Sequence, residues 1–307
     1  MADGVTPPDA LAPPPPRDAV LIVIALLGVS LSGPLMAATA APALAIAFWR
    51  TAFGGGLTGL VVALRARREL RGLDRRQWGL AGLAGGFLAL HFATWVPSLN
   101  LTSVAVATAL VSTQPIFVAA IMAWQGVRMP TLAWVGIVTA VIGVAMITGA
   151  DVTLSGRAVL GDVLAILGGL FAAAYTVVGG RARGTMSAPV YTGICYCACA
   201  GALLVACVVG RQELLGFSAN AWAKIVAVTV SAQLLGHTLI NVVLRTTSAA
   251  VVSIALLLET PGAALVAYLW LGQRPPSSAW PGIVLLLASI GVVIAARDRR
   301  APVEAVE

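Results

Sequence analysis

Charged residues are scarce in this sequence of 307 residues. Asp, Glu, Lys and Arg together make up 10% of the chain, whereas roughly a quarter of the residues of a soluble domain are charged. Hydrophobic residues make up 59%, and the mean hydropathy is +0.95. This composition excludes an ordinary soluble domain and predicts a polytopic membrane protein.

Motifs for nucleotide hydrolysis and for catalysis inside the membrane are also missing. No G-x-x-x-x-G-K-[ST] loop occurs, which excludes ATP hydrolysis by that route. The only two histidines, His91 and His237, lie on separate predicted helices, and no Asp is placed in the middle of a span. A zinc set or a pair of catalytic aspartates cannot be assembled from these residues. An intramembrane enzyme is therefore the least favoured function class, and no metal or cofactor is predicted.

The sequence repeats itself at an offset of 146 residues. This offset aligns seven Pro, Trp, Gly and Arg positions between residues 115–136 and residues 261–282. It also aligns His91 with His237. Agreement among these residue types at one offset is not expected by chance, so the chain is predicted to hold two copies of one unit.

Apolar segments long enough to cross a bilayer, which takes roughly 17–25 residues per helix, recur along the chain. Ten such segments are predicted: Ala19–Ala38, Ala43–Leu64, Trp78–Pro97, Ser103–Trp124, Thr131–Thr148, Leu160–Gly180, Ala188–Val209, Ala221–Val243, Ser248–Leu271 and Ala279–Ala296. Because each copy has an odd number of spans, the second copy is inserted upside down relative to the first. The predicted fold is an all-α integral membrane protein with ten transmembrane helices, arranged as two inverted five-helix repeats over residues 18–150 and 158–296.

The basic residues predict how the chain is oriented in the membrane. With a cytoplasmic N-terminus, fourteen basic residues fall on the inside and four on the outside, as the positive-inside rule requires. Both ends are then cytoplasmic, with a disordered tail at 1–17 and a second tail at 297–307. The net charge of +7 is explained by these topology signals. The predicted partner is therefore the lipid bilayer, and no nucleic acid is expected.

Polar side chains inside the predicted spans are the first candidates for function. A charge at the bilayer centre costs roughly 2.5–3.5 kcal/mol, so it normally faces a cavity or a partner. Arg50 and Glu259 are such residues, and an ion pair between them that holds the bundle together is one alternative to a role in binding. A polar stripe that is expected to face the bundle interior or a wet pathway recurs every four residues along one helix face: Thr229, Gln233, His237 and Asn241.

Two prolines, Pro115 and Pro261, lie near the middle of their spans. Each removes an amide donor and is expected to free the carbonyl of the residue four positions earlier, Val111 or Leu257. Kinks at equivalent points of two inverted repeats mark a favourable place for a binding site at the membrane midplane. A bend that only sets the shape of the bundle would be duplicated in the same way, so both interpretations stay open.

Several short motifs carry a resemblance to a known family. They are Gly236–Asn241, Ser248–Ser253 and Leu256–Pro261 in the second copy, with Trp49–Thr51, Leu101–Ala105 and Gln114–Pro115 in the first. These motifs resemble those of the EamA-type drug/metabolite transporters, over nearly the whole chain. The resemblance implies a central cavity that opens to one side at a time and export from bacteria across the inner (plasma) membrane. One departure is that Gly126-Val127 and Gly272-Gln273 stand where the family often has Gly-Glu, so a carboxylate function at those helix ends is not expected.

The sequence therefore predicts a secondary transporter that exports amino acids or similar small metabolites by alternating access. Efflux of lipophilic drugs is the alternative, and a mainly apolar cavity would favour it. Spans one, three, four, six, eight and nine are expected to line the cavity, and the expected substrate contacts are Arg50, His91, Trp95, Gln114, Tyr175, His237 and Glu259. A coupling proton carried by Glu259 and a homodimer are left open.

Overall fold

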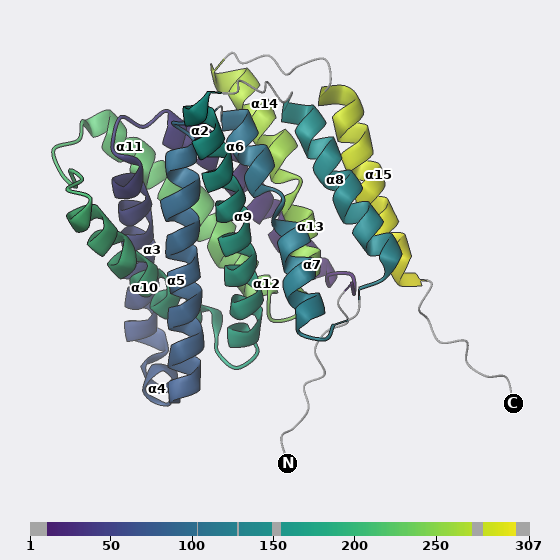
Figure 1. The fold of residues 1–307 in the computed structure, drawn as a ribbon. Coiled ribbons are helices and arrows are strands. Elements are labelled where there is room, and N and C mark those ends of the chain that lie inside the picture. The colour runs from purple at the N-terminus through teal and green to yellow at the C-terminus, as the bar shows by residue number, and fades with distance from the viewer. Residues whose placement is uncertain (1–10, 103, 128, 149–154, 272–278, 299–307) are drawn as a thin grey trace, which may run out of the picture.

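The computed structural model describes residues 11–298 except 103, 128, 149–154 and 272–278, and these residues form helices joined by turns and loops (Figure 1). In this part of the chain, eight helical segments are long and apolar enough to cross a membrane. Two shorter apolar segments, Thr131–Met146 and Trp280–Ser289, lie where the fifth and tenth spans are predicted. The apolar helices thus follow the predicted spans along the sequence.

The first half of the chain contains the first five of these segments. In order, they are α1 (Pro16–Ser30) with α2 (Ser32–Ala37), α3 (Ala43–Arg65), α5 (Arg75–Ser98), α6 (Val104–Val111) with α7 (Gln114–Trp124), and α8 (Thr131–Thr148); the short helix α4 (Arg67–Arg71) joins α3 to α5. Helix α1 begins inside the predicted tail at 1–17, because a proline fits the first turn of a helix, where its missing amide has no partner to lose.

The second half contains the other five segments. They are α9 (Gly156–Arg183), α10 (Ala188–Val209), α11 (Ala219–Val228) with η1 (Thr229–Thr238) and α12 (Leu239–Val243), α13 (Ala249–Leu256) with α14 (Glu259–Leu271), and α15 (Ala279–Asp298). The prediction that the polar stripe of the eighth span lies on an α-helix is wrong, because the ten residues in the middle of this span form the π-helix η1. A π-helix has i→i+5 hydrogen bonds and is often found at functional sites.

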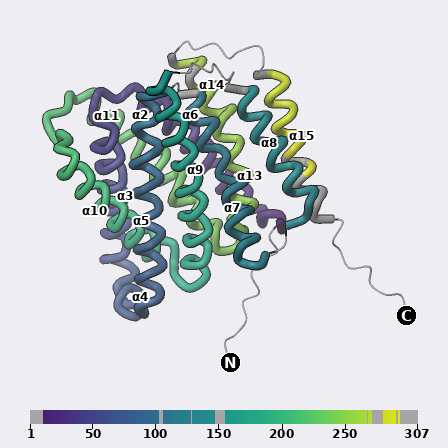
Figure 2. Tube along the Cα trace, in the orientation of Figure 1, coloured from purple at the N-terminus to yellow at the C-terminus, as the bar shows by residue number. Residues whose placement is uncertain are grey.

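The helices pack mainly between the two halves of the chain. Helix α5 lies against α9, α3 against α10, α8 against α15, and α1 against η1. The repeat relates each span of the first half to the span five places later. It therefore relates the pair α5 and α9 (spans three and six) to the pair η1 and α1 (spans eight and one), and it relates each of the pairs α3–α10 and α8–α15 to itself. Figure 2 follows the same arrangement along the Cα trace, with the pair α8 and α15 at one edge of the bundle. This pattern is the one expected of two copies of one unit.

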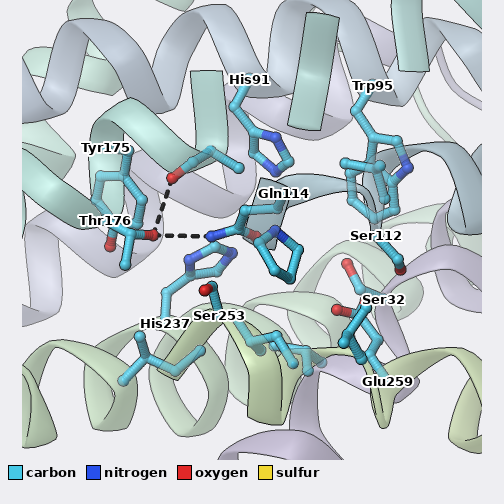
Figure 3. Close-up of a pocket in the computed structure, with 17 residues that line it drawn as sticks. Ser32, His91, Trp95, Ser112, Gln114, Tyr175, Thr176, His237, Ser253 and Glu259 are labelled. Atoms are coloured by element: carbon cyan, nitrogen blue, oxygen red, sulfur yellow. Dashed lines mark hydrogen bonds between the residues drawn. The ribbon is translucent and has the colours of Figure 1, made fainter. Parts of the chain in front are cut away.

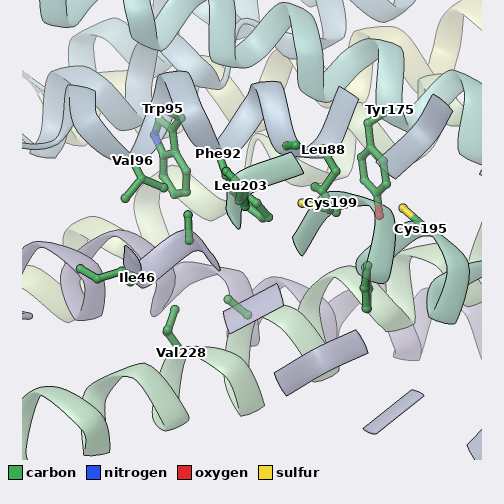
Figure 4. Packing of buried hydrophobic residues seen from close by; sticks show 14 of the residues in the cluster. Ile46, Leu88, Phe92, Trp95, Val96, Tyr175, Cys195, Cys199, Leu203 and Val228 are labelled. Atoms are coloured by element: carbon green, nitrogen blue, oxygen red, sulfur yellow. The ribbon is translucent and has the colours of Figure 1, made fainter. Parts of the chain in front are cut away.

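The largest buried apolar cluster also draws on both halves (Figure 4). Phe92 and Trp95 of α5 belong to it, together with Tyr175 of α9 and Leu203 of α10. Small residues allow the helices to approach this closely. A Cβ atom at Gly85 of α5, for example, would lie 2.4 Å from a backbone carbonyl oxygen of α10, so only glycine fits there.

Two spans are broken at the predicted prolines. Helix α6 ends and α7 begins just before Pro115, and α13 ends and α14 begins just before Pro261. The predicted loss of a hydrogen bond at the carbonyl of Leu257 is wrong, because this oxygen accepts from the N–H of Thr260 at 3.3 Å. A local adjustment of this kind is a common way to satisfy the backbone around a proline inside a membrane.

The end of the fourth span is a left-handed turn at Gly126, whose φ is +86°. Glycine adopts this conformation without steric cost, which is why it commonly ends helices. Val127 follows it where the family resemblance leads one to look for a glutamate. The equivalent residues of the second copy, 272 and 273, lie outside the described residues.

Candidate functional site

A cavity lies beside the two helix breaks (Figure 3). Six spans line it, the first, third, fourth, sixth, eighth and ninth. The space open to the centres of water-sized spheres is about 60 Å³, which is room for a few water molecules. Six of the seven predicted contact residues lie in its wall: His91, Trp95, Gln114, Tyr175, His237 and Glu259.

The two helix breaks meet in this region. Ser112 Oγ and Thr260 Oγ1 lie 3.0 Å apart, so a hydrogen bond joins the broken fourth span to the broken ninth. A Cβ atom at Gly169 of α9 would lie 2.9 Å from the carbonyl oxygen of Val111, so glycine is needed for α9 to pass this close. Glu259, the first residue of α14, lines the cavity.

Gln114, at the start of α7, is held by a chain of hydrogen bonds. Its Nε2 donates to Thr176 Oγ1 at 3.0 Å, and that hydroxyl donates to the carbonyl of Ala172 at 2.8 Å (Figure 3). The chain fixes the orientation of the amide, because only the NH₂ end can donate. The amide oxygen of Gln114 is thereby left as an acceptor at the cavity wall.

The two histidines lie in the same cavity wall, with ring centroids 6.5 Å apart. Nδ1 of His91 is 2.9 Å from the carbonyl oxygen of Gly168. A carbonyl oxygen only accepts, so this nitrogen carries a proton and, in the neutral ring, Nε2 is the acceptor. The His91 ring also stacks on Trp95 at 5.5 Å with an interplanar angle of 14°. His91 is therefore fixed in place.

The ring of His237 is held less firmly. Its buried Nδ1 has no hydrogen-bond partner among the described residues, and the same is true of Nε1 of Trp95. Both residues line the cavity. A buried polar atom without a partner costs free energy, so these two atoms gain the most from a polar ligand.

Tyr175 faces the cavity with its ring, while its hydroxyl is used elsewhere. The hydroxyl lies 3.0 Å from Oδ1 and 2.7 Å from Nδ2 of Asn241. Tyr196 of α10 lies 3.4 Å from the same Nδ2 and 3.1 Å from Thr238 Oγ1. This network joins α9, α10 and the end of the eighth span. Tyr175 can therefore offer a substrate its aromatic surface but not a free hydroxyl.

Arg50 is the one predicted contact residue that does not line the cavity. It is 0% exposed. Its Nε donates to Gln233 Oε1 at 3.1 Å, its Nη1 donates to Ser32 Oγ at 3.2 Å, and its guanidinium lies 4.4 Å from the centre of the Phe92 ring. Among the described residues, no hydrogen bond joins Arg50 to Glu259, and the Nη2 of Arg50 has no hydrogen-bond partner. Ser32 lines the cavity, so Arg50 supports the wall from behind.

Besides Ser112, which lies next to the predicted break before Pro115, three hydroxyl side chains of the cavity wall are absent from the sequence prediction: Ser32, Thr176 and Ser253. Ser253 lies in one of the motifs that carry the family resemblance, and Thr176 directly follows Tyr175. These two positions in the sequence could have indicated that Ser253 and Thr176 lie at the cavity. Isolated Ser and Thr in apolar helices commonly bond to their own backbone, which makes them weak markers of a site.

Comparison with known proteins places the chain in a family. The family model described as "EamA-like transporter family" matches residues 17–149 and again residues 159–295. A solved structure titled "Crystal structure of protein" superposes with a TM-score of 0.75 over 93% of this chain and 99% of that chain, at 16% identity, a likeness that shows the fold. A search of curated proteins gives no match. The two family matches cover most of the sequence, and the chain belongs to the EamA-like transporter family.

Proposed function

We propose that the protein is a secondary transporter that exports amino acids or similar small amphipathic metabolites. Membership of a transporter family gives the class, a multi-pass membrane transporter of small molecules. The observation that carries the finer proposal is the cavity between the two halves, at the point where two broken spans meet. Sites of this kind occur in transporters built from inverted repeats.

The groups around the cavity support a small substrate with charged and apolar parts. The Glu259 carboxylate and the amide oxygen of Gln114 suit an ammonium group, because both accept hydrogen bonds, while the imidazole of His237 can donate to a carboxylate. Trp95 and the ring of Tyr175 offer apolar surface to a side chain. The wall is mainly apolar, the feature that favours efflux of lipophilic drugs, whereas the volume of about 60 Å³ supports a small metabolite over a bulky drug.

The proposed mechanism is alternating access between two inverted halves, residues 18–150 and 158–296. At the basic end of the bundle, Asp18 Oδ2 accepts hydrogen bonds from Thr246 and, at 2.9 Å, from Thr247. These bonds join the start of α1 to the loop before α13. In the orientation proposed here this end is cytoplasmic, and these bonds separate when the cavity opens to the cytoplasm.

Glu259 is the proposed carrier if a proton drives transport. Its carboxyl group lines the cavity, and Arg50 is engaged by Gln233 and Ser32 instead of holding Glu259 in an ion pair. A carboxyl group without a bonded cation can take up and release a proton as the cavity opens to either side.

A counterflow assay in proteoliposomes tests the proposal. Vesicles loaded with one unlabelled amino acid are expected to accumulate the same labelled amino acid, whereas protein-free vesicles and vesicles loaded with a nucleobase are not. Uptake restricted to lipophilic dyes would support drug efflux instead. Turnover of a substrate by the purified protein in detergent, without compartments, would identify an enzyme and contradict transport.

A further inference from the structure

A second, separate concavity opens on the outer surface of the bundle. It lies at the end where α4 joins α3 to α5, and Figure 1 shows the place of α4. Its volume is about 420 Å³. Side chains of α3 and α10 form an apolar floor, and glycines at positions 59 and 193 keep this floor low. Arg67 and Arg71 of α4 and the half-exposed Trp78 of α5 form the rim. We call this concavity the arginine groove.

The two rim arginines keep their charges available. Both side chains are exposed. The carboxylates nearest to them in the sequence have other partners: Glu69 accepts from the backbone N–H of Ser187 at 2.7 Å, and Asp74 accepts from the N–H of Gln77 at 2.7 Å at the start of α5. Neither carboxylate neutralises Arg67 or Arg71 in the described structure. The rim thus offers two guanidinium groups to an anion, and guanidinium groups bind phosphate in a bidentate manner.

A comparable groove on a neighbouring pair of helices shows that the charge is local. It lies between α5 and α10, has a volume of about 380 Å³, and is lined by Leu83, Gly86, Phe87, Ala89 and other apolar residues. No arginine or lysine lines this control groove. The two grooves are similar in size, but only the arginine groove carries positive charge. That charge would favour an anionic lipid headgroup over a neutral one.

We propose that the arginine groove binds one anionic phospholipid. Its phosphate lies between Arg67 and Arg71, its glycerol backbone lies at the level of Trp78, and one acyl chain occupies the apolar floor. Tryptophan favours this level of a membrane, and basic pockets between spans are typical sites for anionic lipid headgroups. The apolar floor selects a lipid over free phosphate, because inorganic phosphate has nothing to place there.

Native mass spectrometry of the full-length protein tests this with two lipids that carry the same acyl chains, a phosphatidylglycerol and a phosphatidylethanolamine. The wild-type protein is expected to retain one phosphatidylglycerol molecule in preference to phosphatidylethanolamine. Arg67→Gln/Arg71→Gln should lower its affinity about 25-fold, since each basic residue near a membrane surface contributes about fivefold. Arg75→Gln/Arg76→Gln removes the same charge from neighbouring exposed residues outside the groove and should lower the affinity less than threefold.

A matched pair of glycine replacements tests the apolar floor. Gly59 lines the arginine groove and Gly86 the control groove, and a Cβ atom at either would meet nothing within 4 Å. Both replacements therefore leave the packing of the helices intact. Gly59→Leu fills the arginine groove and should abolish the preference for phosphatidylglycerol, whereas Gly86→Leu should leave it unchanged.

Three results would overturn the proposal. The first is an equal loss of affinity in the Arg67/Arg71 and Arg75/Arg76 double variants, because the attraction would then be diffuse. The second is unchanged lipid retention in Gly59→Leu. The third is displacement of the lipid by millimolar inorganic phosphate, which would show an anion site without a lipid. Arg67→Lys/Arg71→Lys keeps the charge and should retain most of the preference, which separates loss of charge from loss of folding.

Discussion

Replacing Arg50 with methionine removes a buried cation that supports the cavity from behind. The guanidinium donates to Gln233 and to Ser32 and lies over the ring of Phe92. Methionine fills much of the same space but can make none of these polar contacts. Because Ser32 lines the cavity, the change should weaken both the fold and transport.

The size of the effect follows from these contacts. Two hydrogen bonds from a charged donor contribute about 1.5–3 kcal/mol each, and a desolvated cation–π contact contributes about 2 kcal/mol. The substitution also relieves the cost of keeping an arginine inside a membrane, about 2.5–3.5 kcal/mol. We therefore expect a net loss of about 2–5 kcal/mol in the free energy of unfolding. At about 2 °C per kcal/mol, this loss lowers the Tm by about 4–10 °C.

Thermal unfolding in detergent, combined with counterflow in proteoliposomes, measures both consequences. Arg50→Met leaves the buried amide of Gln233 without its hydrogen-bond donor, and Gln233→Leu removes that amide. The double variant Arg50→Met/Gln233→Leu should therefore lose about 1–3 kcal/mol less than the sum of the losses in the two single variants. Arg50→Lys should fall between wild type and Arg50→Met, since one ammonium group cannot replace the guanidinium fork. A wild-type Tm for Arg50→Met, or strictly additive single effects, would refute the reasoning.

Three further predictions concern the cavity and the packing around it. His237→Ala should reduce transport more than His91→Ala, because a ring without a fixed partner is free to bind a substrate; equal losses at matched expression would contradict this. Glu259→Gln should abolish uptake driven by a pH gradient while sparing counterflow, and unchanged gradient-driven uptake would exclude proton coupling through this residue. Gly28→Ala places a Cβ atom 2.4 Å from a backbone oxygen of η1 and should cost about 1–3 kcal/mol. Gly86→Ala, with open space around it, should be neutral or stabilising by up to about 1 kcal/mol in the same unfolding assay.

The positions of the apolar helices could be predicted from the sequence because the bilayer imposes a strong constraint. A helix needs about 20 apolar residues to cross it, and the repeat at 146 residues fixes equivalent points in the two halves. The π-helix could not be predicted in this way. Its backbone bonds differ from those of an α-helix only in their register, and α1 packs directly against it through Gly28. Such a choice depends on tertiary contacts that a local pattern does not contain.

The same limit explains the outcome at the site. Polar residues in apolar spans are costly, so His237, Gln114 and Glu259 could be selected from composition alone, and the structure brings them to one cavity. Arg50 satisfies the same criterion, yet it points to Gln233 behind the wall. The direction of its side chain depends on the rotation of α3 about its axis. That rotation is set by close packing against α10, which involves glycines as well as apolar side chains.

Packing between the halves has a consequence for how the protein is made. Arg50 and Gln233 are 183 residues apart in sequence. At a synthesis rate of about 5–20 residues per second, Arg50 is made about 10–40 s before Gln233, so during that time it has only first-half acceptors such as Ser32. During that time the nascent first half holds a charged side chain and an unshielded histidine without their final neighbours. A chain that stops at the midpoint therefore keeps the guanidinium of Arg50 without the amide that accepts from it in the finished fold.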